Sequence, residues 1–397
     1  MLSAASRPYI DASVPVLREH GLIITKTFYR NMLSAHPELK NLFNSGNQAN
    51  GSQQQSLASA VFAYAANIDN AAALAPVVTR IVHKHASLGI KAEHYPIVGH
   101  HLLGAIKEVL GDAATPELLA AWAEAYGLLA DALIDAEKKL YESVGIKPGE
   151  LFDMRVAEII EESEQVKSFI LKSADGTALP TFQPGQYVSV RVLLPSGLQQ
   201  LRQYSLSDAP GKDYLRISVK REVAGKETPA GTISNWLHDN VEVGCTLSIS
   251  KPFGEFAPDV DSNEPIVLLS AGVGITPMIA TLNHIAARQP ERHVIFAHAA
   301  GEAAHHAHRA DVEKAKQRMP NLQSVVFYEN VKADDQAWQG RMQINGLPKW
   351  NREVTNVYLC GPLPFMQEQR AALLTAGVPS QKIHREVFGP DMLDHLL

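Results

Sequence analysis

The spacing of apolar and polar positions divides the chain into stretches with different periods. Up to about residue 143, apolar residues recur every three to four positions, as on amphipathic helices. Breaks at Pro37, Gly46, 89–96, Gly111 and Pro116 separate these periodic segments. The first stretch is therefore predicted to be all-helical.

A short Gly/Pro-containing segment, GIKPGEL at 145–151, precedes a change of pattern. Beyond it, apolar and polar residues alternate, as in QYVSVRVLL and YLRISVKRE, which predicts an antiparallel barrel or sandwich. From about residue 265, apolar strands such as IVLLSAG and VIFAHAA alternate with helical segments, the pattern of a doubly wound α/β domain. The predicted organisation is a helical domain at 1–143, a linker at 144–150, a β-barrel at 151–262 and an α/β domain at 263–397.

Composition narrows the classes of function. The 397 residues are 46% hydrophobic and 20% charged, with a formal net charge of -6, which argues against nucleic-acid or anionic-membrane partners. Cys245 and Cys360 lie far apart, so neither a disulfide framework nor cysteine-bound iron–sulfur is expected. The sequence lacks the pattern of a signal peptide or a membrane span, so a cytoplasmic location is expected.

One helical segment, VVTRIVHKHASLGI at 77–90, carries two histidines. At about 100° per residue, His85 lies within the apolar stripe of Val78 and Ile81, whereas His83 points roughly 140° away from Val78. A single inward histidine is more often a hydrogen-bonded core residue than a metal ligand. Both interpretations of His85 remain open on this pattern alone.

Other predicted helices also direct polar side chains inward. Tyr29 shares a face with Leu33, Gln53 begins the apolar face that continues at Leu57, and Glu137 lies on the apolar stripe of the last helix. A carboxylate on a core stripe requires a partner. Taken separately, Tyr29 and Gln53 could be residues at the edge of an amphipathic face, and Glu137 could turn to solvent.

Taken together, the first 143 residues resemble the globin domain of bacterial flavohemoglobins. The resemblance rests on Tyr29, Phe43, Gln53, Leu57, His85, Tyr95 and Glu137. It implies that His85 is the proximal haem ligand, that Phe43 packs on the porphyrin, and that Tyr29 and Gln53 line the oxygen side. Glu137 would accept a hydrogen bond from the far ring nitrogen of His85, with Tyr95 fixing the geometry, and so increase electron density on iron.

The middle region carries four motifs in order: PGQYVSV (184–190), RQYSLS (202–207), GTISNWLHD (231–239) and KPFGEF (251–256). Each is weak alone, but together they are similar to the flavin-binding barrel of the ferredoxin-reductase superfamily. The resemblance implies that Arg202 pairs with the FAD pyrophosphate, Tyr204 contacts the isoalloxazine and Ser205 hydrogen-bonds at its reactive nitrogen. The backbone around 231–234 would hold phosphate oxygens at a helix start.

The last region carries LSAGVGITPM (269–278), CGPLPFM (360–366) and EVFGP (386–390), and resembles the NAD(P)H domain of the same reductases. Gly272, Gly274 and Thr276 would admit the dinucleotide phosphates, and Phe388 would lie near the flavin. The full set of cofactor-contacting residues that the resemblance implies is Phe43, Leu57, Lys84, Tyr187, Arg202, Gln203, Tyr204, Ser205, Ser234, Gly272, Val273, Gly274, Ile275, Thr276, Pro277, Gly361, Pro362, Val387, Phe388, Gly389 and Pro390.

A histidine-rich segment, HAAGEAAHHAHRAD at 298–311, stands outside these motifs. His305 and His308 have the i, i+3 spacing at which a helix could weakly capture a transition metal. Since the spacing fixes no partner cysteine or acid, the segment is predicted to be a solvated helix.

The order of the three regions resembles flavohemoglobin throughout, which implies haem b, FAD and NAD(P)H as cofactors. The implied activity is nitric oxide dioxygenation: electrons pass from NAD(P)H through FAD to haem iron, and haem-bound O2 reacts with NO to give nitrate. A monomer is expected, with O2, NO and NAD(P)H as partners and a possible lipid in the distal pocket. The alternatives are an O2/NO sensor or store and a haem-dependent hydroperoxide reductase; the choice between NADH and NADPH stays open.

Overall fold

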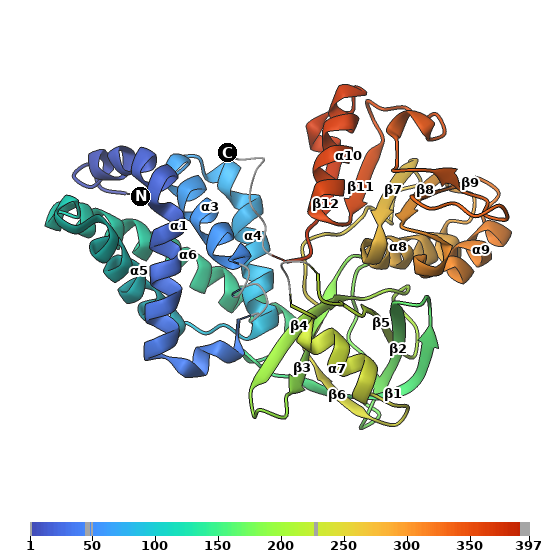
Figure 1. The fold of residues 1–397 in the computed structure, drawn as a ribbon, viewed down its shortest axis with the longest axis horizontal. Helices are drawn as coiled ribbons and strands as arrows, with labels where there is room; N and C mark the ends of the chain where they lie inside the picture. The colour runs from blue at the N-terminus through green and yellow to red at the C-terminus, as the bar shows by residue number, and fades with distance from the viewer. Residues whose placement is uncertain (1, 44–47, 49–50, 226–228, 390–397) are drawn as a thin grey trace.

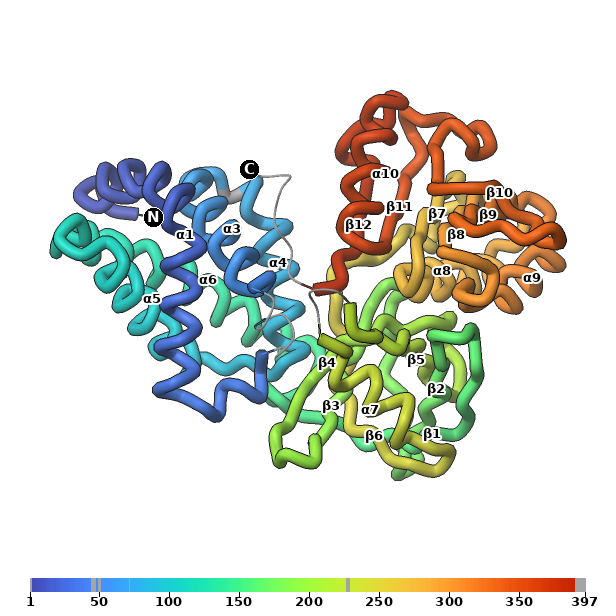
Figure 2. The backbone as a smooth tube through the Cα atoms, viewed as in Figure 1, coloured from blue at the N-terminus to red at the C-terminus, as the bar shows by residue number. Residues whose placement is uncertain are grey.

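The computed structural model describes residues 2–43, 48, 51–225 and 229–389, so the predicted break at Gly46 and the predicted contact residue Pro390 lie outside the described residues. Figures 1 and 2 show three lobes in chain order. A helical lobe (blue to teal) and an α/β lobe (orange to red) lie on either side of a β-rich lobe (green to yellow).

Proline and glycine set the bounds of the helices in the first lobe. The elements are α1 Arg7–Ala35, η1 Pro37–Asn41, α3 Ser52–Ala66, α4 Ala71–Leu88, α5 His94–Leu110, η2 Gly111–Ala113 and α6 Pro116–Val144. Pro37 and Pro116 occupy first helical positions, where a missing N–H costs no helical hydrogen bond. Asn70 and Thr115 cap α4 and α6 by accepting backbone N–H groups.

Two hydrophobic clusters make up most of the helical core. One joins α1, α3, α5 and the first half of α6, and includes the buried Phe28 and Trp122. The other joins α4 with the start of α5 and the second half of α6, and includes Val82 and Leu133. Tyr29, Phe43 and Leu57 belong to the first cluster and Tyr95 belongs to the second, so predicted residues of the two sides of the haem lie in different clusters.

The turn after α4 fixes how the helical lobe meets the segment that follows it. Gly89 ends α4 with a φ of 75°, a left-handed conformation that glycine adopts without a Cβ clash. An added Cβ there would lie 2.5 Å from the Cα of Gly149, so the two backbones touch. The connection between the lobes therefore folds back against the end of α4.

The middle lobe is an antiparallel sheet that curves into a barrel. Its strands are β1 Phe152–Glu161, β2 Val166–Ser173, β3 Tyr187–Leu193, β4 Gln199–Ser205, β5 Leu215–Lys220 and β6 Thr246–Ile249, in the order β4-β3-β6-β1-β2-β5. A bridge between Leu206 and Ile217 brings the two outer strands together. Buried Val188, Phe169 and Leu237 fill the interior, the last of them from α7 Thr232–Asn240.

The last lobe is a parallel sheet with helices on both faces. Its strands are β7 Ile266–Ala271, β8 Val294–Ala300, β9 Leu322–Tyr328, β10 Trp338–Gln339, β11 Asn356–Cys360 and β12 Ile383–Glu386, in the order β10-β9-β8-β7-β11-β12. Helices α8 Ile275–Arg288 and α9 Arg309–Arg318 pack in one core cluster, and α10 Leu363–Thr375 in another. Strand order reverses between β7 and β11, which is the switch point where such sheets bind ligands. The predicted sequence of fold classes is confirmed.

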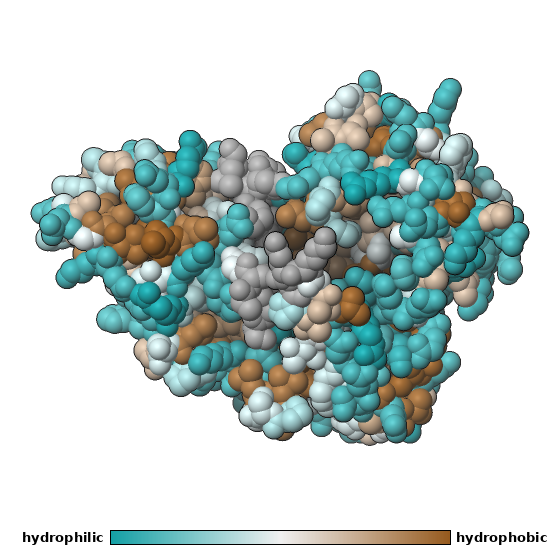
Figure 3. Space-filling model, in the orientation of Figure 1, coloured by the Kyte–Doolittle hydropathy of each residue, from teal (hydrophilic) through white to brown (hydrophobic). Residues whose placement is uncertain are grey.

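The surface is mainly polar, with apolar patches distributed over the lobes (Figure 3). Among the described residues, no helix combines the length and apolar character needed to cross a membrane.

Candidate functional site

His85 is held by a buried acid. Its Nδ1 lies 2.7 Å from Oε1 of Glu137, and the Tyr95 hydroxyl donates to the same oxygen at 2.6 Å. The side chain of Glu137 is only 3% exposed, so its acceptor is shielded from water. Since a carboxylate only accepts, the Nδ1 position of His85 carries the proton that Glu137 binds.

This arrangement leaves the other ring nitrogen of His85 available. The ring is 32% exposed and has apolar Val78, Ile81 and Val82 as helical neighbours. No partner is found for Nε2 among the described residues. Tyr95 is fixed in turn, because Tyr126 donates to its carbonyl at 2.7 Å. A neutral imidazole with a fixed Nδ1 and a free Nε2 is what a haem iron requires of an axial ligand.

The predicted distal residues lie on α1 and α3, and Phe43 lies just after η1. Tyr29 is 6% exposed, and its ring packs edge-on against Phe43 with centroids 5.5 Å apart. Burial raises the pKa of the Tyr29 hydroxyl, which hydrogen-bonds with the Gln53 side chain. Gln53 Oε1 is buried without a partner in the described residues, and Leu57 packs on the same cluster. A pocket of about 550 Å³ opens beside Tyr29.

A second face of α4 contacts the barrel. Arg80, His83, Lys84 and Ser87 follow the i, i+3, i+4, i+7 spacing of one helical face. Arg80 pairs with Glu255 at 2.6 Å, and His83 Nδ1 accepts from the Gly254 N–H at 3.1 Å. Of this row only Lys84 was predicted, as a cofactor contact; the contact of the row with the barrel was missed because its partners lie more than 100 residues away. The four-position polar spacing was the available signal.

Lys84 makes the contact that matters most for the predicted flavin site. Its Nζ donates to Oε1 of Gln203 at 2.7 Å, and the Gln203 amide donates to Ser189 at 3.1 Å. Burial, opposed by the charge of Glu386, lowers the pKa of Lys84 to about 8. The residue before His85 therefore touches the strand that carries the RQYSLS motif.

The alternation along β4 separates the predicted flavin residues into two sets. In the β3–β4 register, Arg202 pairs with Val190 and Tyr204 with Val188, so Arg202 and Tyr204 share a face. Gln203 and Ser205 point to the opposite face, which Lys84 approaches. Arg202 and Tyr204 are half-buried, and burial lowers the pKa of Arg202 and raises that of Tyr204.

Tyr187 and Ser234 have local roles in addition to the predicted ones. Tyr187 is buried with Phe253, Ala86 and Tyr141, and its hydroxyl hydrogen-bonds with Ser87 of α4. It thus lies where the helical and barrel lobes meet. Ser234 is near the start of α7, where its hydroxyl contacts the Gly231 carbonyl at 3.3 Å.

The two glycine-containing turns of the α/β lobe lie against each other. The turn after β7, Gly272–Gly274, leads into α8, and the Thr276 hydroxyl donates to the Val273 carbonyl at 3.0 Å. A Cβ on Gly274 would lie 2.3 Å from the Cys360 carbonyl oxygen, so only glycine fits beside the end of β11. These turns place the remaining predicted residues Ile275, Pro277, Gly361 and Pro362 at the switch point of the sheet.

The chain beyond β12 leaves the α/β lobe through an exposed segment. Glu386 is buried at the end of the strand, Val387 is half-buried, and Phe388 and Gly389 are exposed. Phe388 is 43% exposed, a high value for a large aromatic residue. Such a ring is free to contact a bound ligand.

The prediction of a solvated helix over 298–311 is wrong. His298 belongs to β8, which runs to Ala300, and α9 begins only at Arg309. His298, His306 and His308 are buried, because strand β8 lies inside the sheet and the segment after it packs under the barrel. His305 and His308 are not brought together: His305 approaches Glu302 at 3.9 Å, and His308 contacts Asp311 at 3.0 Å.

Three domain families match the chain in the order of the lobes. Residues 26–133 match the globin family, 153–257 the oxidoreductase FAD-binding domain and 268–371 the oxidoreductase NAD-binding domain. The prediction of haem, flavin and nicotinamide cofactors is thereby confirmed at the level of domains.

Full-length relatives share this order. A flavohemoprotein from Bordetella parapertussis is 49% identical, covering 98% of this chain and 99% of that protein. One from Chromobacterium violaceum is 50% identical, covering 98% of each. The crystal structure of a flavohemoglobin from Malassezia yamatoensis with bound FAD and heme is 33% identical with a TM-score of 0.86, over 98% of this chain and 100% of that one.

The reductase half also matches a separate structure. The FAD/NAD-binding domain of a nitric oxide dioxygenase from Vibrio cholerae is 38% identical with a TM-score of 0.56, over 60% of this chain and 99% of that one. Fold and site together define an electron-transfer oxidoreductase in which a haem globin is fused to a flavin reductase. The chain belongs to the flavohemoprotein family.

Proposed function

We propose that the protein is an NAD(P)H-dependent nitric oxide dioxygenase that converts NO and dioxygen to nitrate. The observation that carries the proposal is the contact between His85 Nδ1 and the buried Glu137 carboxylate. A globin that only stores oxygen has little need of an acid behind its ligand. A family neighbour, the Vibrio cholerae protein, is named a nitric oxide dioxygenase, which supports the same reaction.

The residues present fit the three cofactors. His85 would hold haem iron through Nε2, Arg202, Tyr204 and Ser205 would hold FAD, and the turn Gly272–Gly274 would admit the dinucleotide. When bound, haem supplies a one-electron iron centre for gas chemistry, and FAD splits the two-electron hydride of NAD(P)H into single electrons.

On the proximal side, Glu137 orients the imidazole and increases its basicity. The hydrogen bond from Nδ1 gives the ring partial imidazolate character, so His85 donates more strongly through Nε2. Tyr95 shares the same acceptor oxygen and restrains the carboxylate. Burial and the neighbouring Glu137 raise the pKa of Tyr95, which keeps its hydroxyl a donor.

On the distal side, Tyr29 supplies a hydrogen-bond donor. The raised pKa of its hydroxyl keeps it protonated throughout the physiological range. Gln53 restrains that hydroxyl from the start of α3 and contributes a carbonyl oxygen that has no partner among the described residues. A protonated phenol that packs in a hydrophobic cluster stabilises negative charge that develops on a small gaseous ligand.

Between the two halves, Lys84 connects the helix of His85 to the β4 strand. Its contact with Gln203 places the Lys84 side chain on the face of β4 opposite Arg202 and Tyr204. The Arg80–Glu255 pair and the His83–Gly254 hydrogen bond restrain the same helical face. Together these contacts hold α4 at a fixed distance from the flavin-binding face.

Oxygen-dependent NO consumption by the purified holoprotein tests the proposal. Forming nitrate from NO and O2 takes up one electron, so one NAD(P)H should be oxidised for every two NO consumed. Nitrate should accumulate in proportion, and the reaction should stop without oxygen. Reversible NO binding without NAD(P)H oxidation would identify a sensor or store, and faster turnover on hydroperoxide than on NO would identify a reductase.

A further inference from the structure

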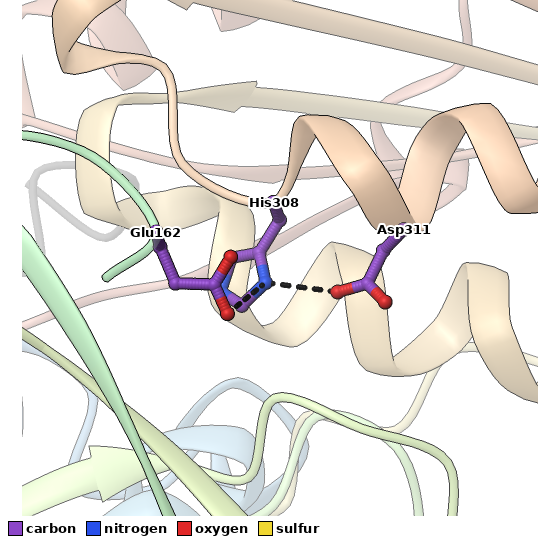
Figure 4. A group of neighbouring side chains, drawn as sticks. All are labelled: Glu162, His308 and Asp311. Carbon is purple, nitrogen blue, oxygen red and sulfur yellow. Dashed lines mark hydrogen bonds and ion pairs between the residues drawn. The ribbon is translucent and has the colours of Figure 1, made fainter. Parts of the chain in front are cut away.

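A buried polar network joins the barrel to the α/β lobe and is made of residues other than the proposed cofactor contacts. It involves β2, β5 and the residues after β4 on the barrel side, and α8 and α9 on the other. Figure 4 shows its centre, where His308 lies between Glu162 of the barrel and Asp311 of α9.

His308 spans the boundary with both ring nitrogens. Its Nδ1 donates to Asp311 Oδ2 at 3.0 Å and lies 3.5 Å from Glu162 Oε1. Its Nε2 lies 3.0 Å from the Ser218 hydroxyl on β5. The ring is completely buried, so each of these contacts replaces a contact with water.

Ser218 continues the network within the barrel. Its Oγ lies 2.7 Å from both Ser168 and Ser207, and Ser168 donates to Glu162 at 2.6 Å. Ser168 and Ser218 face each other in the β2–β5 register, so the sheet itself positions the pair. The hydroxyls therefore form a continuous path from His308 back to Glu162.

A second set of contacts crosses the same boundary beside the histidine. Arg216 of β5 pairs with Asp311 at 2.8 Å. Asp208, which lies 3.9 Å from Arg216, accepts from Asn283 of α8 at 2.9 Å. Both helices on this face of the α/β sheet are thus bound to the barrel through charged or amide groups.

Two other interpretations of this cluster are disfavoured. Ligand atoms of Glu162, His308 and Asp311 lie within 4.8 Å of one another, but each side chain already has a protein partner, and Arg216 already balances Asp311. A cation would have to displace these bonds. The Ser218–His308–Asp311 order also resembles a hydrolase triad, but Ser218 is only 3% exposed and cannot meet a substrate.

The network lies next to the proposed dinucleotide turn. Strand β5, which carries Arg216 and Ser218, contacts the turn Gly272–Gly274. On the other side, the Glu164 N–H donates to the Ala304 carbonyl at 3.1 Å, which joins the β1–β2 connection to the segment containing His308. Movement of the α/β lobe on the barrel would therefore displace the turn relative to the flavin-binding strand.

We propose that His308 and Asp311 are positioning residues that lock the nicotinamide-binding lobe onto the flavin barrel in the orientation required for hydride transfer. Domains within a chain move relative to one another unless their interface prevents it. Hydride transfer is sensitive to that movement, because about 1 Å of misplacement costs roughly a hundredfold in rate. The inference rests on the proposed path from NAD(P)H to flavin.

The backbone of His308 determines which variants test the lock cleanly. It is the one non-glycine residue with positive φ among the described residues, at φ 60° and ψ 21°. Asparagine and glycine tolerate this left-handed conformation, whereas most other side chains add strain. His308→Gly removes the bridge, His308→Asn retains an amide that can form part of it, and Ser218→Ala removes the barrel partner without touching this backbone.

The experiment is anaerobic stopped-flow reduction of FAD by NADH in the purified holoprotein, before NO is added. His308→Gly and Ser218→Ala should lower the limiting rate by roughly 10- to 100-fold while the apparent Kd for NADH changes less than about twofold. The limiting rate of His308→Asn should lie between those of His308→Gly and the unmodified protein. His305→Ala is the matched control, because His305 lies in the same segment outside the network, and it should leave the rate unchanged.

Unchanged limiting rates in Ser218→Ala and His308→Gly would overturn the lock. So would a loss of rate that only parallels loss of bound FAD or a lower melting temperature, since that pattern indicates a merely structural role. If His308→Gly fails to fold, Ser218→Ala decides alone. Normal flavin reduction without NO consumption in the unmodified protein would refute the proposed function while leaving this test intact.

Discussion

His85 and His308 are both held through Nδ1 by a carboxylate, at 2.7 Å from Glu137 and 3.0 Å from Asp311. They differ at the other nitrogen. His308 Nε2 contacts Ser218 and its ring is fully buried, whereas the side chain of His85 is about one-third exposed and its Nε2 has no partner among the described residues. The same imidazole–carboxylate pair therefore joins two lobes at His308. At His85 it leaves the second ring nitrogen available to bind a ligand.

The difference shows that a carboxylate partner alone does not identify a metal ligand. What distinguishes the two sites is the number of protein partners left to the second nitrogen and the polarity around it. At His308 that nitrogen contacts the first of a chain of hydroxyls, whereas at His85 no protein partner is found among the described residues and the helical neighbours are apolar. Substitutions on each side should therefore change different observables.

Replacing the two histidines should break the comparison most completely. His85→Ala should abolish the five-coordinate haem spectrum and NO turnover and leave flavin absorbance intact, because it removes the proposed iron ligand but none of the proposed flavin contacts. His308→Gly should leave the haem spectrum unchanged. Absorption spectroscopy of both purified variants is the measurement, and retention of a normal haem spectrum by His85→Ala would place the ligand elsewhere.

On the distal side, Tyr29→Phe should increase the rate of oxygen dissociation by roughly ten- to a hundredfold. This range corresponds to losing a hydrogen bond worth about 1.5–3 kcal/mol to a partly charged ligand. Flash photolysis or stopped-flow mixing measures the rate. Tyr64→Phe is a matched control, because the Tyr64 hydroxyl donates to the Ala125 carbonyl within the same cluster. An unchanged rate in Tyr29→Phe would remove its proposed role.

A third histidine, the buried His306, extends the comparison because no carboxylate partner is found for it among the described residues. His306 Nδ1 contacts the Tyr328 hydroxyl at 2.7 Å and its Nε2 is buried without a partner among the described residues. Burial, with the charge of Arg309, lowers the pKa of His306 to about 3 from 6.5. Below pH 6.5 the unfolded chain binds the proton and the folded chain does not, so stability falls as pH decreases toward 3.

The free energy of unfolding is expected to be about 2 kcal/mol lower at pH 5 than at pH 7 because of His306. Calorimetry of the α/β lobe at the two pH values measures it, and His306→Gln should reduce the difference because glutamine does not titrate. Equal acid sensitivity in the variant and the unmodified protein would show that His306 is not the group responsible.

The smallest effect should come from replacing Glu137, whose carboxylate contacts Nδ1 of the proposed iron ligand His85. Glu137→Gln should retain haem but lower the iron–histidine stretching frequency, because a neutral amide is a weaker hydrogen-bond acceptor for the Nδ1 proton than a carboxylate. Activity should fall by about tenfold, the lower end for outer partners of a metal ligand. Resonance Raman spectroscopy measures the shift. Asp311→Asn is the counterpart in the other region and should leave that frequency unchanged; an unshifted Glu137→Gln would exclude the proximal effect.

Much of the fold could be predicted from local pattern. The change from helical to alternating periodicity after residue 145 and the strand–helix alternation after 265 correspond to the three lobes, and the fold classes are confirmed. His85 and Glu137 could each be placed on the apolar stripe of its own helix, but their contact was implied only by the resemblance to bacterial flavohemoglobins. The assigned roles of the site residues stay predictions.

The contacts between lobes could not be predicted in the same way. Lys84 and Gln203 are 119 positions apart, and His308 and Ser218 are 90 apart, so no local period relates them. The prediction for the segment 298–311 is wrong for a related reason. Its alanines favour a helix, but β8 extends into it, and its buried histidines pack inside the α/β lobe or, at His308, against the barrel.

The left-handed backbone of His308 also limits how this protein can diverge. Histidine codons reach asparagine or aspartate by a single base change, and both residues accept the conformation with little penalty. Leucine, proline and arginine are equally close in the genetic code but fit the site poorly. Substitutions that accumulate at this position should therefore be to short polar residues. Each of them should weaken the contact between the barrel and the α/β lobe.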